Sequence, residues 1–262
     1  MPVLAGPRPQ DVEHHVQREA PDIVVVSSFA RILPAAMVET TPYINVHYAP
    51  LPAYRGRANV NWAIINGEHE TAVTVHSIVP GLDAGPILIQ RRVPIGPRDT
   101  VTDLYRELNA TQASILPDAV KLRLTGKVGT AQDESLATYC CGRVPDDGLI
   151  DWSDSTESID RLIRGLTSPY PGAFSYVAGN RIVVERASPV DDPPTYVGRI
   201  PGRVVRVNRD EGSVDVLTGD GLIRVEAVRV GGEAQRPCEI AGSLQLTFAD
   251  FDSRDGRGPR DA

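Results

Sequence analysis

The hydrophobic pattern of this 262-residue chain changes near residue 126, and this change constrains the fold more than any other feature. Before it, short apolar runs alternate with segments of helical spacing, which is typical of an α/β sheet with helices on its faces. After it, short strand candidates follow at regular intervals, which favours a small barrel or sandwich. We predict two domains, residues 1–125 and 139–250, with a linker at 126–138 and a disordered tail at 251–262.

The first domain is predicted to contain a parallel sheet, because residues 23–26 form a continuous β-branched run. Such runs suit a strand that is buried on both faces. A long helix is predicted over residues 100–125, where Thr100 and Asp103 have the spacing of a capping box. A polar helix at residues 9–20 and strands at 2–5, 43–47, 71–78 and 86–93 complete the prediction.

The second domain is predicted to be rich in β-structure. One helix fits residues 155–167, and a turn at residues 219–221 is well suited to a hairpin. Strands are predicted at residues 173–177, 181–187, 203–207, 213–217, 221–230 and 243–248.

Charge and composition exclude several classes of function. The net charge is −7 with no basic run, which disfavours a nucleic-acid partner. No stretch approaches the roughly 20 apolar residues of a spanning helix, and no signal peptide is recognisable, so we expect a cytoplasmic protein without a membrane partner. Three cysteines, with Cys140 and Cys141 adjacent, cannot form a disulfide framework and are poorly spaced for a metal, so no metal is expected.

Three polar residues fall at predicted strand ends, where open α/β sheets bind their ligands. Asn45 and His47 are two apart, so their side chains point the same way on a strand, and Asp83 follows the next strand in a Gly-rich turn. An imidazole can take the proton of an attacking amine, a carboxylate can orient it, and an amide N–H can stabilise an oxyanion. On spacing alone, an ordinary strand end followed by a turn remains an open alternative.

Two longer segments carry a resemblance to a known family. Residues 44–62, INVHYAPLPAYRGRANVNW, resemble the signature of the folate-dependent formyltransferases, I-N-x-H-x-S-L-L-P-x-Y-R-G-x-x-P-x-x-W. Residues 71–87, TAVTVHSIVPGLDAGPI, resemble a second segment of that family, T-G-V-T-x-H followed by D-x-G-x-I. The resemblance implies a Rossmann-like catalytic domain, Asn45, His47 and Asp83 as the catalytic residues, and 10-formyltetrahydrofolate as the co-substrate.

The same resemblance implies which residues hold the folate. It also implies that the chain has the second domain of the family. It assigns folate contacts to Phe29, Ala30, Arg31, Arg57, Val79, Pro80, Gly81 and Leu82. Residues 141–184 resemble the OB-like second domain of methionyl-tRNA formyltransferases, and more closely that of the bacterial enzyme acting on UDP-4-amino-4-deoxy-L-arabinose.

The chain also departs from the family pattern. Ala49 and Pro50 replace Ser-Leu, Asn59 replaces Pro, and Ala72 replaces Gly. Family members begin with a βαβ unit before the segment that matches residues 1–6, which resemble the third strand of the family domain. We therefore expect an upstream strand–loop–helix–strand unit, or a partner chain that supplies it.

Four functions fit these features. The favoured one is transfer of a formyl group to a primary amine of a small molecule such as an amino sugar nucleotide. Methionyl-tRNA is the alternative acceptor, disfavoured by the acidic charge because phosphate contacts need Lys and Arg. A formyl-folate hydrolase and a truncated, non-catalytic remnant are further alternatives. The oligomeric state is left open.

Overall fold

The computed structural model describes residues 8–29, 31 and 33–249, and divides the chain into two compact units. The first unit comprises the chain up to Val60, His69–Ile95 and Leu104–Gly142. The second comprises Asn61–Glu68, Gly96–Asp103 and the chain from Arg143 onward. The domain boundaries placed at residues 125, 138 and 250 remain predictions. The strand predicted at 2–5 and the tail predicted at 251–262 lie outside the described residues.

The first unit is built on a four-stranded sheet with the order β1-β2-β4-β5. Its strands are β1 (Val24–Ser27), β2 (Tyr43–His47), β4 (Glu70–Ser77) and β5 (Ile87–Pro94). β1 runs parallel to β2, whereas β2–β4 and β4–β5 are antiparallel. The predicted α/β class is therefore confirmed, with a mixed sheet.

The edge position of β1 overturns one expectation about burial. Val25 is 41% exposed, so the prediction that residues 23–26 are buried on both faces is wrong. Among the described strands β1 pairs with β2 alone, which leaves its other side without a strand neighbour. By contrast β4 pairs on both sides, and its polar residues Thr74 and His76 are as deeply buried as Val73 and Val75.

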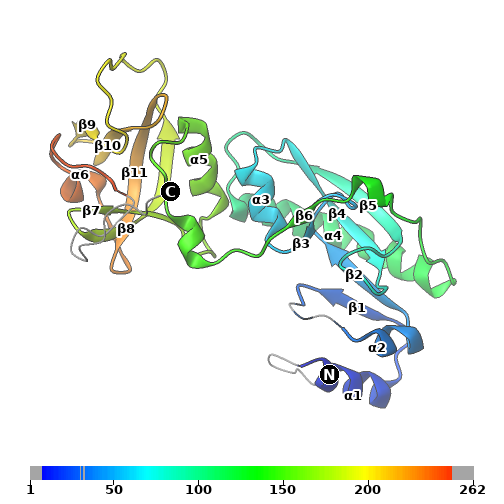
Figure 1. The fold of residues 1–262 in the computed structure, drawn as a ribbon. Coiled ribbons are helices and arrows are strands. Elements are labelled where there is room, and N and C mark those ends of the chain that lie inside the picture. The colour runs from blue at the N-terminus through cyan, green and yellow to red at the C-terminus, as the bar shows by residue number, and fades with distance from the viewer. Residues whose placement is uncertain (1–7, 30, 32, 250–262) are drawn as a thin grey trace. The chain divides into compact units, whose positions relative to one another are not determined.

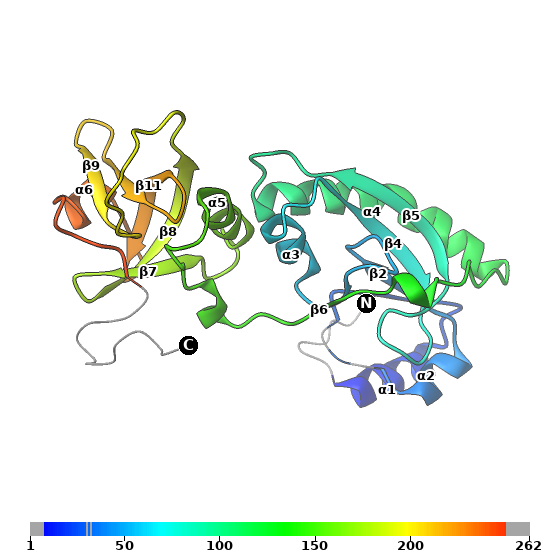
Figure 2. The same cartoon turned by 45° about the horizontal axis from the view of Figure 1, so that its top comes forward.

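Helix α4 (Val101–Leu124) lies along one face of this sheet (Figures 1 and 2). It begins where the capping box was predicted, since the Thr100 N–H donates to Asp103 Oδ2 at 3.1 Å and the Asp103 N–H to Thr100 Oγ1 at 3.3 Å. Leu104, Leu108 and Ile115 are buried on its inner face. The shorter helices of the chain's first part are α1 (Pro9–Glu19), α2 (Ala35–Thr40) and α3 (Asn59–Ile65).

Residues 128–140, which we call the strap, belong to the first unit and pack along its other segments. The Ser77 hydroxyl donates to the Val128 carbonyl at 2.7 Å, and Thr130 forms a bridge with Ile87. Further along, the 3₁₀ helix η1 (Glu134–Leu136) precedes β6 (Tyr139–Cys140), which pairs in parallel with β3 (Arg55–Gly56). Most of the segment predicted as a linker thus lies within the strap.

The second unit has an antiparallel sheet with the order β7-β8-β11-β10-β9. Residues near the end of the described chain connect its two outer strands, because Ala249 bridges to Tyr176 of β7 and Thr247 to Arg203 just before β9. This pairing closes the sheet in the manner of a small barrel. The strand predicted at 243–248 is therefore present only as isolated bridges at 247 and 249. The elements are η2 (Pro145–Gly148), α5 (Thr156–Gly165), β7 (Ala173–Val177), β8 (Asn180–Pro189), β9 (Val204–Asn208), β10 (Ser213–Leu217), β11 (Leu222–Val230), β12 (Glu233–Gln235) and α6 (Pro237–Ile240).

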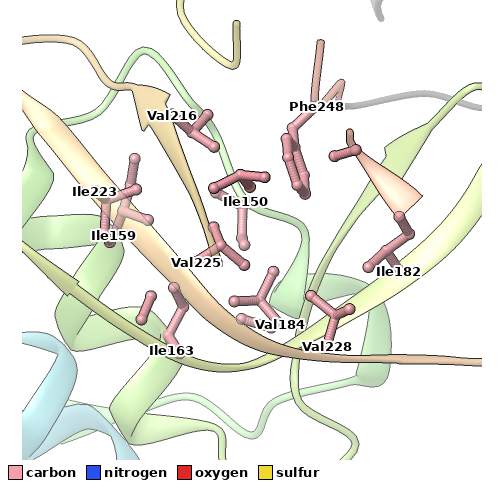
Figure 3. Packing of buried hydrophobic residues seen from close by; sticks show 14 of the residues in the cluster. Ile150, Ile159, Ile163, Ile182, Val184, Val216, Ile223, Val225, Val228 and Phe248 are labelled. Carbon is pink, nitrogen blue, oxygen red and sulfur yellow. The ribbon is translucent and has the colours of Figure 1, made fainter. Parts of the chain in front are cut away.

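One apolar core holds the second unit together. Ile150, Ile182, Val214 and Ile223 are completely buried within it. Helix α5 contributes Ile163, which Figure 3 shows together with Ile150, Ile182 and Ile223. The predicted spacing of apolar residues on α5 is confirmed, since Ile159 and Ile163 are both buried. β12 and α6 were not predicted from the sequence.

Candidate active site

Strand β2 presents Asn45 and His47 on the same side, because residues two apart on a strand point to one face. Its antiparallel partner β4 places His76 opposite Asn45 and Thr74 opposite His47. The Asn45 amide nitrogen consequently lies 3.2 Å from His76 Nε2. The other His76 nitrogen, Nδ1, donates to the Ser77 carbonyl at 2.9 Å, which leaves Nε2 as the acceptor for Asn45.

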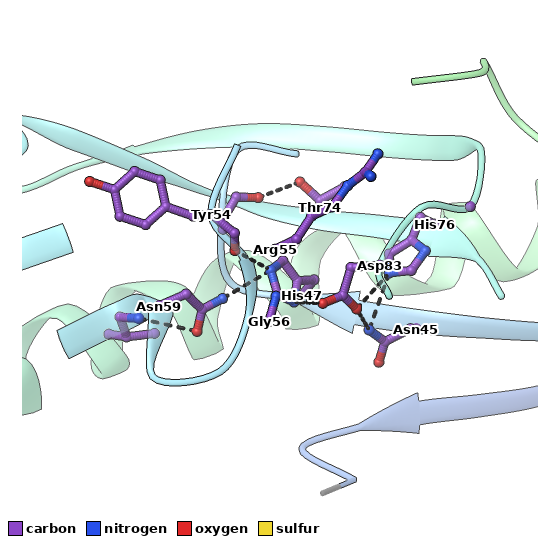
Figure 4. A network of polar contacts seen from close by, with 12 residues as sticks. Asn45, His47, Tyr54, Arg55, Gly56, Asn59, Thr74, His76 and Asp83 are labelled. Atoms are coloured by element: carbon purple, nitrogen blue, oxygen red, sulfur yellow. Dashed lines mark hydrogen bonds and ion pairs between the residues drawn. The ribbon is translucent and has the colours of Figure 1, made fainter. Parts of the chain in front are cut away.

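The turn after β4 brings Asp83 to these residues (Figure 4). Its Oδ2 lies 3.7 Å from His47 Nδ1 and accepts the Gly56 N–H at 2.9 Å. Its Oδ1 lies 3.4 Å from the Asn45 amide nitrogen and 3.7 Å from His76 Nε2. The structure thus gathers Asn45, His47 and Asp83 into one cluster, as predicted, and adds His76.

The chain must bend sharply to place Asp83 there. Asp83 has φ 49, in the left-handed region that few residues other than Gly, Asn and Asp adopt. Two residues on, a Cβ on Gly85 would lie 1.6 Å from the Ser77 carbonyl oxygen, so only glycine fits. These constraints explain the D-x-G pattern by close packing of the turn against β4.

The two central groups of the cluster have shifted pKa values. Burial lowers the pKa of His47, and the opposing influence of the Asp83 carboxylate and the Tyr54 carbonyl does not overcome it. Burial alone would raise the pKa of Asp83, but the contacts with His76, His47 and the Gly56 N–H together lower it. Near neutral pH the cluster therefore combines a neutral imidazole with an ionised carboxylate, which is the arrangement of a general base beside an anion.

The strap holds the Asp83 turn in place through hydrogen bonds. The Gln132 side chain donates through Nε2 to the carbonyls of Asp83 and Gly85, both at 2.7 Å. Its Oε1 accepts from Arg55 Nη2 at 2.8 Å, and Arg55 Nη2 also contacts Glu134 Oε1 at 2.7 Å. Arg55 is 1% exposed, so this charge is buried and satisfied by the strap.

Most of the residues expected to hold the folate are more exposed than the residues of the cluster. Phe29 lines a cavity of about 210 Å³ together with Val24, Val26 and Tyr43. Arg31 and Arg57 are exposed. In the turn that carries Asp83, Val79 is half-buried, Pro80 and Gly81 are exposed, and Leu82 is 51% exposed. Ala30 lies outside the described residues.

Three neighbours of the cluster were not predicted from the sequence as site residues. His76 stood in the T-x-H part of the second motif, and a strand register would have placed it opposite Asn45. Asn59, whose amide nitrogen lies 3.1 Å from His47 Nε2, was visible only as a departure from the signature. Gln132 gave no signal, because it belongs to a short polar stretch.

Comparisons with known proteins agree with this fold. Residues 5–120 match the family described as Formyl transferase, and residues 143–243 match the family described as Formyl transferase, C-terminal domain. The methionyl-tRNA formyltransferase of Geotalea uraniireducens is 37% identical over 86% of this chain and 71% of its own length. The chain therefore belongs to the formyl transferase family. Membership confirms the expected class of enzyme, a transferase whose formyl donor is a formylated tetrahydrofolate.

Solved structures share the fold at lower identity. HypX from Aquifex aeolicus in complex with tetrahydrofolic acid has a TM-score of 0.70 and 21% identity, over 90% of this chain. The chain spans 41% of the length of HypX. A likely sugar N-formyltransferase from Mycobacterium tuberculosis has a TM-score of 0.56 and 21% identity, over 63% of this chain and 72% of its own.

Two further observations concern metal-ligating groups and membrane-spanning helices. Within the described residues, no group of three His, Cys, Asp or Glu side chains is arranged to hold a metal ion. Among the helices of the same part of the chain, none has the length and hydropathy needed to cross a membrane.

Proposed function

We propose that this chain transfers the formyl group of 10-formyltetrahydrofolate to the amino group of methionyl-tRNA. The observation that supports this acceptor most strongly is the 37% identity to a methionyl-tRNA formyltransferase across both domains. This reverses the order expected from the net charge of −7, which favoured a small acceptor. A charge total over a whole chain does not describe a local binding face, whereas the match over 86% of the chain includes residues of both predicted domains.

The cluster supports a direct transfer from donor to amine. The amine nitrogen forms a bond to the formyl carbon, and the bond from that carbon to N10 of the folate breaks. In this proposal His47 accepts the proton that the amine loses and then gives a proton to N10 as it leaves, so the imidazole ends the reaction neutral. Asn45 donates to the formyl oxygen as it becomes negative, and Asp83 stabilises the protonated imidazole.

The donor side of the site suits a flat ligand with an apolar face. Leu82 directly precedes Asp83 and is 51% exposed, so it offers an apolar surface beside that residue. We propose that Phe29, Arg31, Arg57 and residues 79–82 contact the folate, in line with the family resemblance. Their roles, like those of Asn45, His47 and Asp83, remain proposals.

An amino sugar nucleotide is the second candidate acceptor. The acidic balance of the chain favours it, because a tRNA surface attracts Lys and Arg. The experiment is a competition in which methionyl-tRNA and an amino sugar nucleotide are offered together with 10-formyltetrahydrofolate.

Formation of each formylated product is measured at several salt concentrations. We expect formyl-methionyl-tRNA to dominate at low salt and its kcat/KM to fall steeply as salt rises, because phosphate contacts release counterions. Dominant formylation of the sugar, with little dependence on salt, would contradict the proposed acceptor. Folate release without either product would favour the hydrolase alternative.

A further inference from the structure

The Nε2 atom of His47 has two partners that make opposite demands. The Tyr54 carbonyl oxygen lies 2.9 Å from it, and the Asn59 amide nitrogen lies 3.1 Å from it (Figure 4). A carbonyl oxygen only accepts a hydrogen bond, and an amide nitrogen only donates one. Nε2 can therefore satisfy Tyr54 when it carries a proton and Asn59 when it does not, but never both together.

The orientation of the Asn59 amide is fixed by its other end. The Val60 backbone N–H donates to Asn59 Oδ1 at 3.1 Å, so Oδ1 is already occupied. The amide nitrogen consequently faces the imidazole. If the amide were turned around, the Val60 N–H and the amide NH₂ would face each other as two donors.

We propose that Asn59 is a positioning residue that stabilises the neutral form of His47 with its proton on Nδ1, and that Tyr54 replaces Asn59 as the partner of Nε2 when that nitrogen is protonated. The His47 side chain is only 7% exposed, so water cannot readily serve as either partner. A buried polar atom without a partner is strongly destabilised. The pair of partners lets His47 gain and lose a proton at Nε2 without that penalty.

Two titratable groups among the described residues face His47 and enter the same balance. Asp83 Oδ2 lies 3.7 Å from Nδ1, and the His76 ring lies edge-on with its centroid 6.5 Å away. Asp83 favours a proton on Nδ1, which is the proton that remains when Asn59 donates to Nε2. Asp83 and Asn59 therefore favour the same neutral tautomer from opposite sides of the ring, while Asp83 also favours the charged form.

This device belongs to the present chain and not to the family signature, in which position 59 is proline. Proline has no side-chain donor, so it cannot offer Nε2 the hydrogen bond that Asn59 offers. The consequence for catalysis rests on the proposed function, because it assumes that His47 accepts the proton of the amine. The preferred tautomer of His47 does not depend on that assumption.

The test is a titration of His47 by nuclear magnetic resonance in the whole protein without substrates. The ring nitrogens of ¹⁵N-histidine report the tautomer and the charge, and a His47→Gln variant assigns the His47 signals. In Asn59→Ala we expect less of the Nδ1–H tautomer and a titration midpoint about 0.5–1 pH unit higher, the shift that loss of one hydrogen bond produces. In Asn59→Asp the midpoint should rise further, because a carboxylate stabilises the imidazolium.

Asn109→Ala is the matched control, since Asn109 bonds to the Tyr48 hydroxyl and lies outside the cluster. It should leave the His47 titration unchanged. If Asn59→Ala does not fold, Asn59→Pro serves instead, because proline is well tolerated in the first turn of a helix and α3 begins at residue 59. An unchanged or lower midpoint in whichever folded donor-less variant is used would overturn the proposal.

Activity separates this proposal from the proposed function. Formyl transfer should require neutral His47, so its rate should fall as the pH drops through the pKa of His47. In the Asn59 variants this acid limb should move to higher pH together with the titration. A shifted titration with an unshifted acid limb would support the role of Asn59 and refute the role of His47 as the base.

Discussion

The two units of this chain both bury charged groups, but they arrange them differently. In the second unit these groups lie outside the apolar core, in ion pairs of Asp160 with Arg164 and of Asp215 with Arg224. The core of the second unit is apolar, with Ile150, Ile182 and Val214 completely inaccessible to solvent. The first unit also has apolar residues inside its sheet, but it gathers the buried groups of His47, His76 and Arg55, each at 6% exposure or less, around the Asp83 turn. Burying such groups is unfavourable unless each finds partners, and here the partners come from the Asp83 turn and the strap.

This difference predicts which property, stability or rate, a substitution in each unit should change. The stabilisation gained by burying apolar groups is roughly proportional to the buried area, and a cavity left in the core lowers it further. Substitutions in the core of the second unit should therefore alter stability. The polar cluster is held by few hydrogen bonds with defined directions, so changes there should alter the geometry of the site and hence the rate. Three predictions test whether stability and rate separate in this way.

The largest effect is expected for His47→Ala. Loss of a general base typically lowers a rate by about 10²–10⁴-fold. Removal of the buried imidazole leaves folate binding nearly intact, because the residues proposed to bind folate lie on other segments. Formyl transfer is followed by product formation, and folate binding by calorimetry.

His69→Ala is the control for His47→Ala. His69 belongs to the same unit and is exposed, so its removal should change neither quantity. A His47→Ala enzyme that keeps most of its activity would show that His47 is not the base. The cluster would then give no support to the idea that substitutions in the first unit mainly alter the rate.

The next effect is expected for Ile182→Ala, on stability. Ile182 is fully buried in β8, and removing a large aliphatic side chain from a core costs about 2–5 kcal/mol of unfolding free energy. Chemical denaturation measures this loss, and kcat at a temperature where the variant is folded should stay within about twofold of the unmodified protein, given the independence expected for distant sites. Ile200→Ala is the matched control, because Ile200 is 52% exposed and should lose little. Equal losses in the two variants would mean that the second unit is not held together by this core.

Much of the first unit could be predicted from residue patterns. The capping pattern at Thr100 and Asp103 identified the start of α4 to within one residue, because the signal is local. The pairing of Asn45 with His47 followed from the period of a strand. The fold class followed from alternation of apolar runs and helical spacing, and the family motifs named the same three residues independently.

Other features depend on contacts between distant parts of the chain. The exposure of Val25 follows from which strands pair, and β-branched residues alone do not reveal an edge. The strap looked like a linker because its contacts with Ser77, Arg55 and the Asp83 turn involve polar side chains without periodicity. A strand was predicted at 243–248, whereas the chain there forms only a bridge at Thr247 and another at Ala249, one residue beyond the predicted strand. A short apolar stretch carries no information about its pairing partner.

The smallest effect is expected for Gln132→Ala, which tests whether the strap acts on the rate through Asp83. Gln132 donates to the carbonyls of Asp83 and Gly85, so its loss should let the turn relax and move the carboxylate away from His47. We expect kcat to fall about tenfold, the equivalent of roughly 1.4 kcal/mol of lost hydrogen bonding in the transition state, with KM for the folate nearly unchanged. Gln90→Ala is the matched control, because Gln90 also donates to a backbone carbonyl, that of Leu51, yet does not contact the turn. It should lower stability by a similar amount and leave kcat nearly unchanged.

A double-mutant cycle with Asp83→Asn completes the test. Residues that act through one another have non-additive effects, so Gln132→Ala should have little further effect once the carboxylate is gone. Full additivity of the two changes, or an equal fall of kcat in Gln90→Ala, would show that the strap merely stabilises the unit, and the contrast between a unit tuned for rate and a unit built for stability would then rest on the cluster alone.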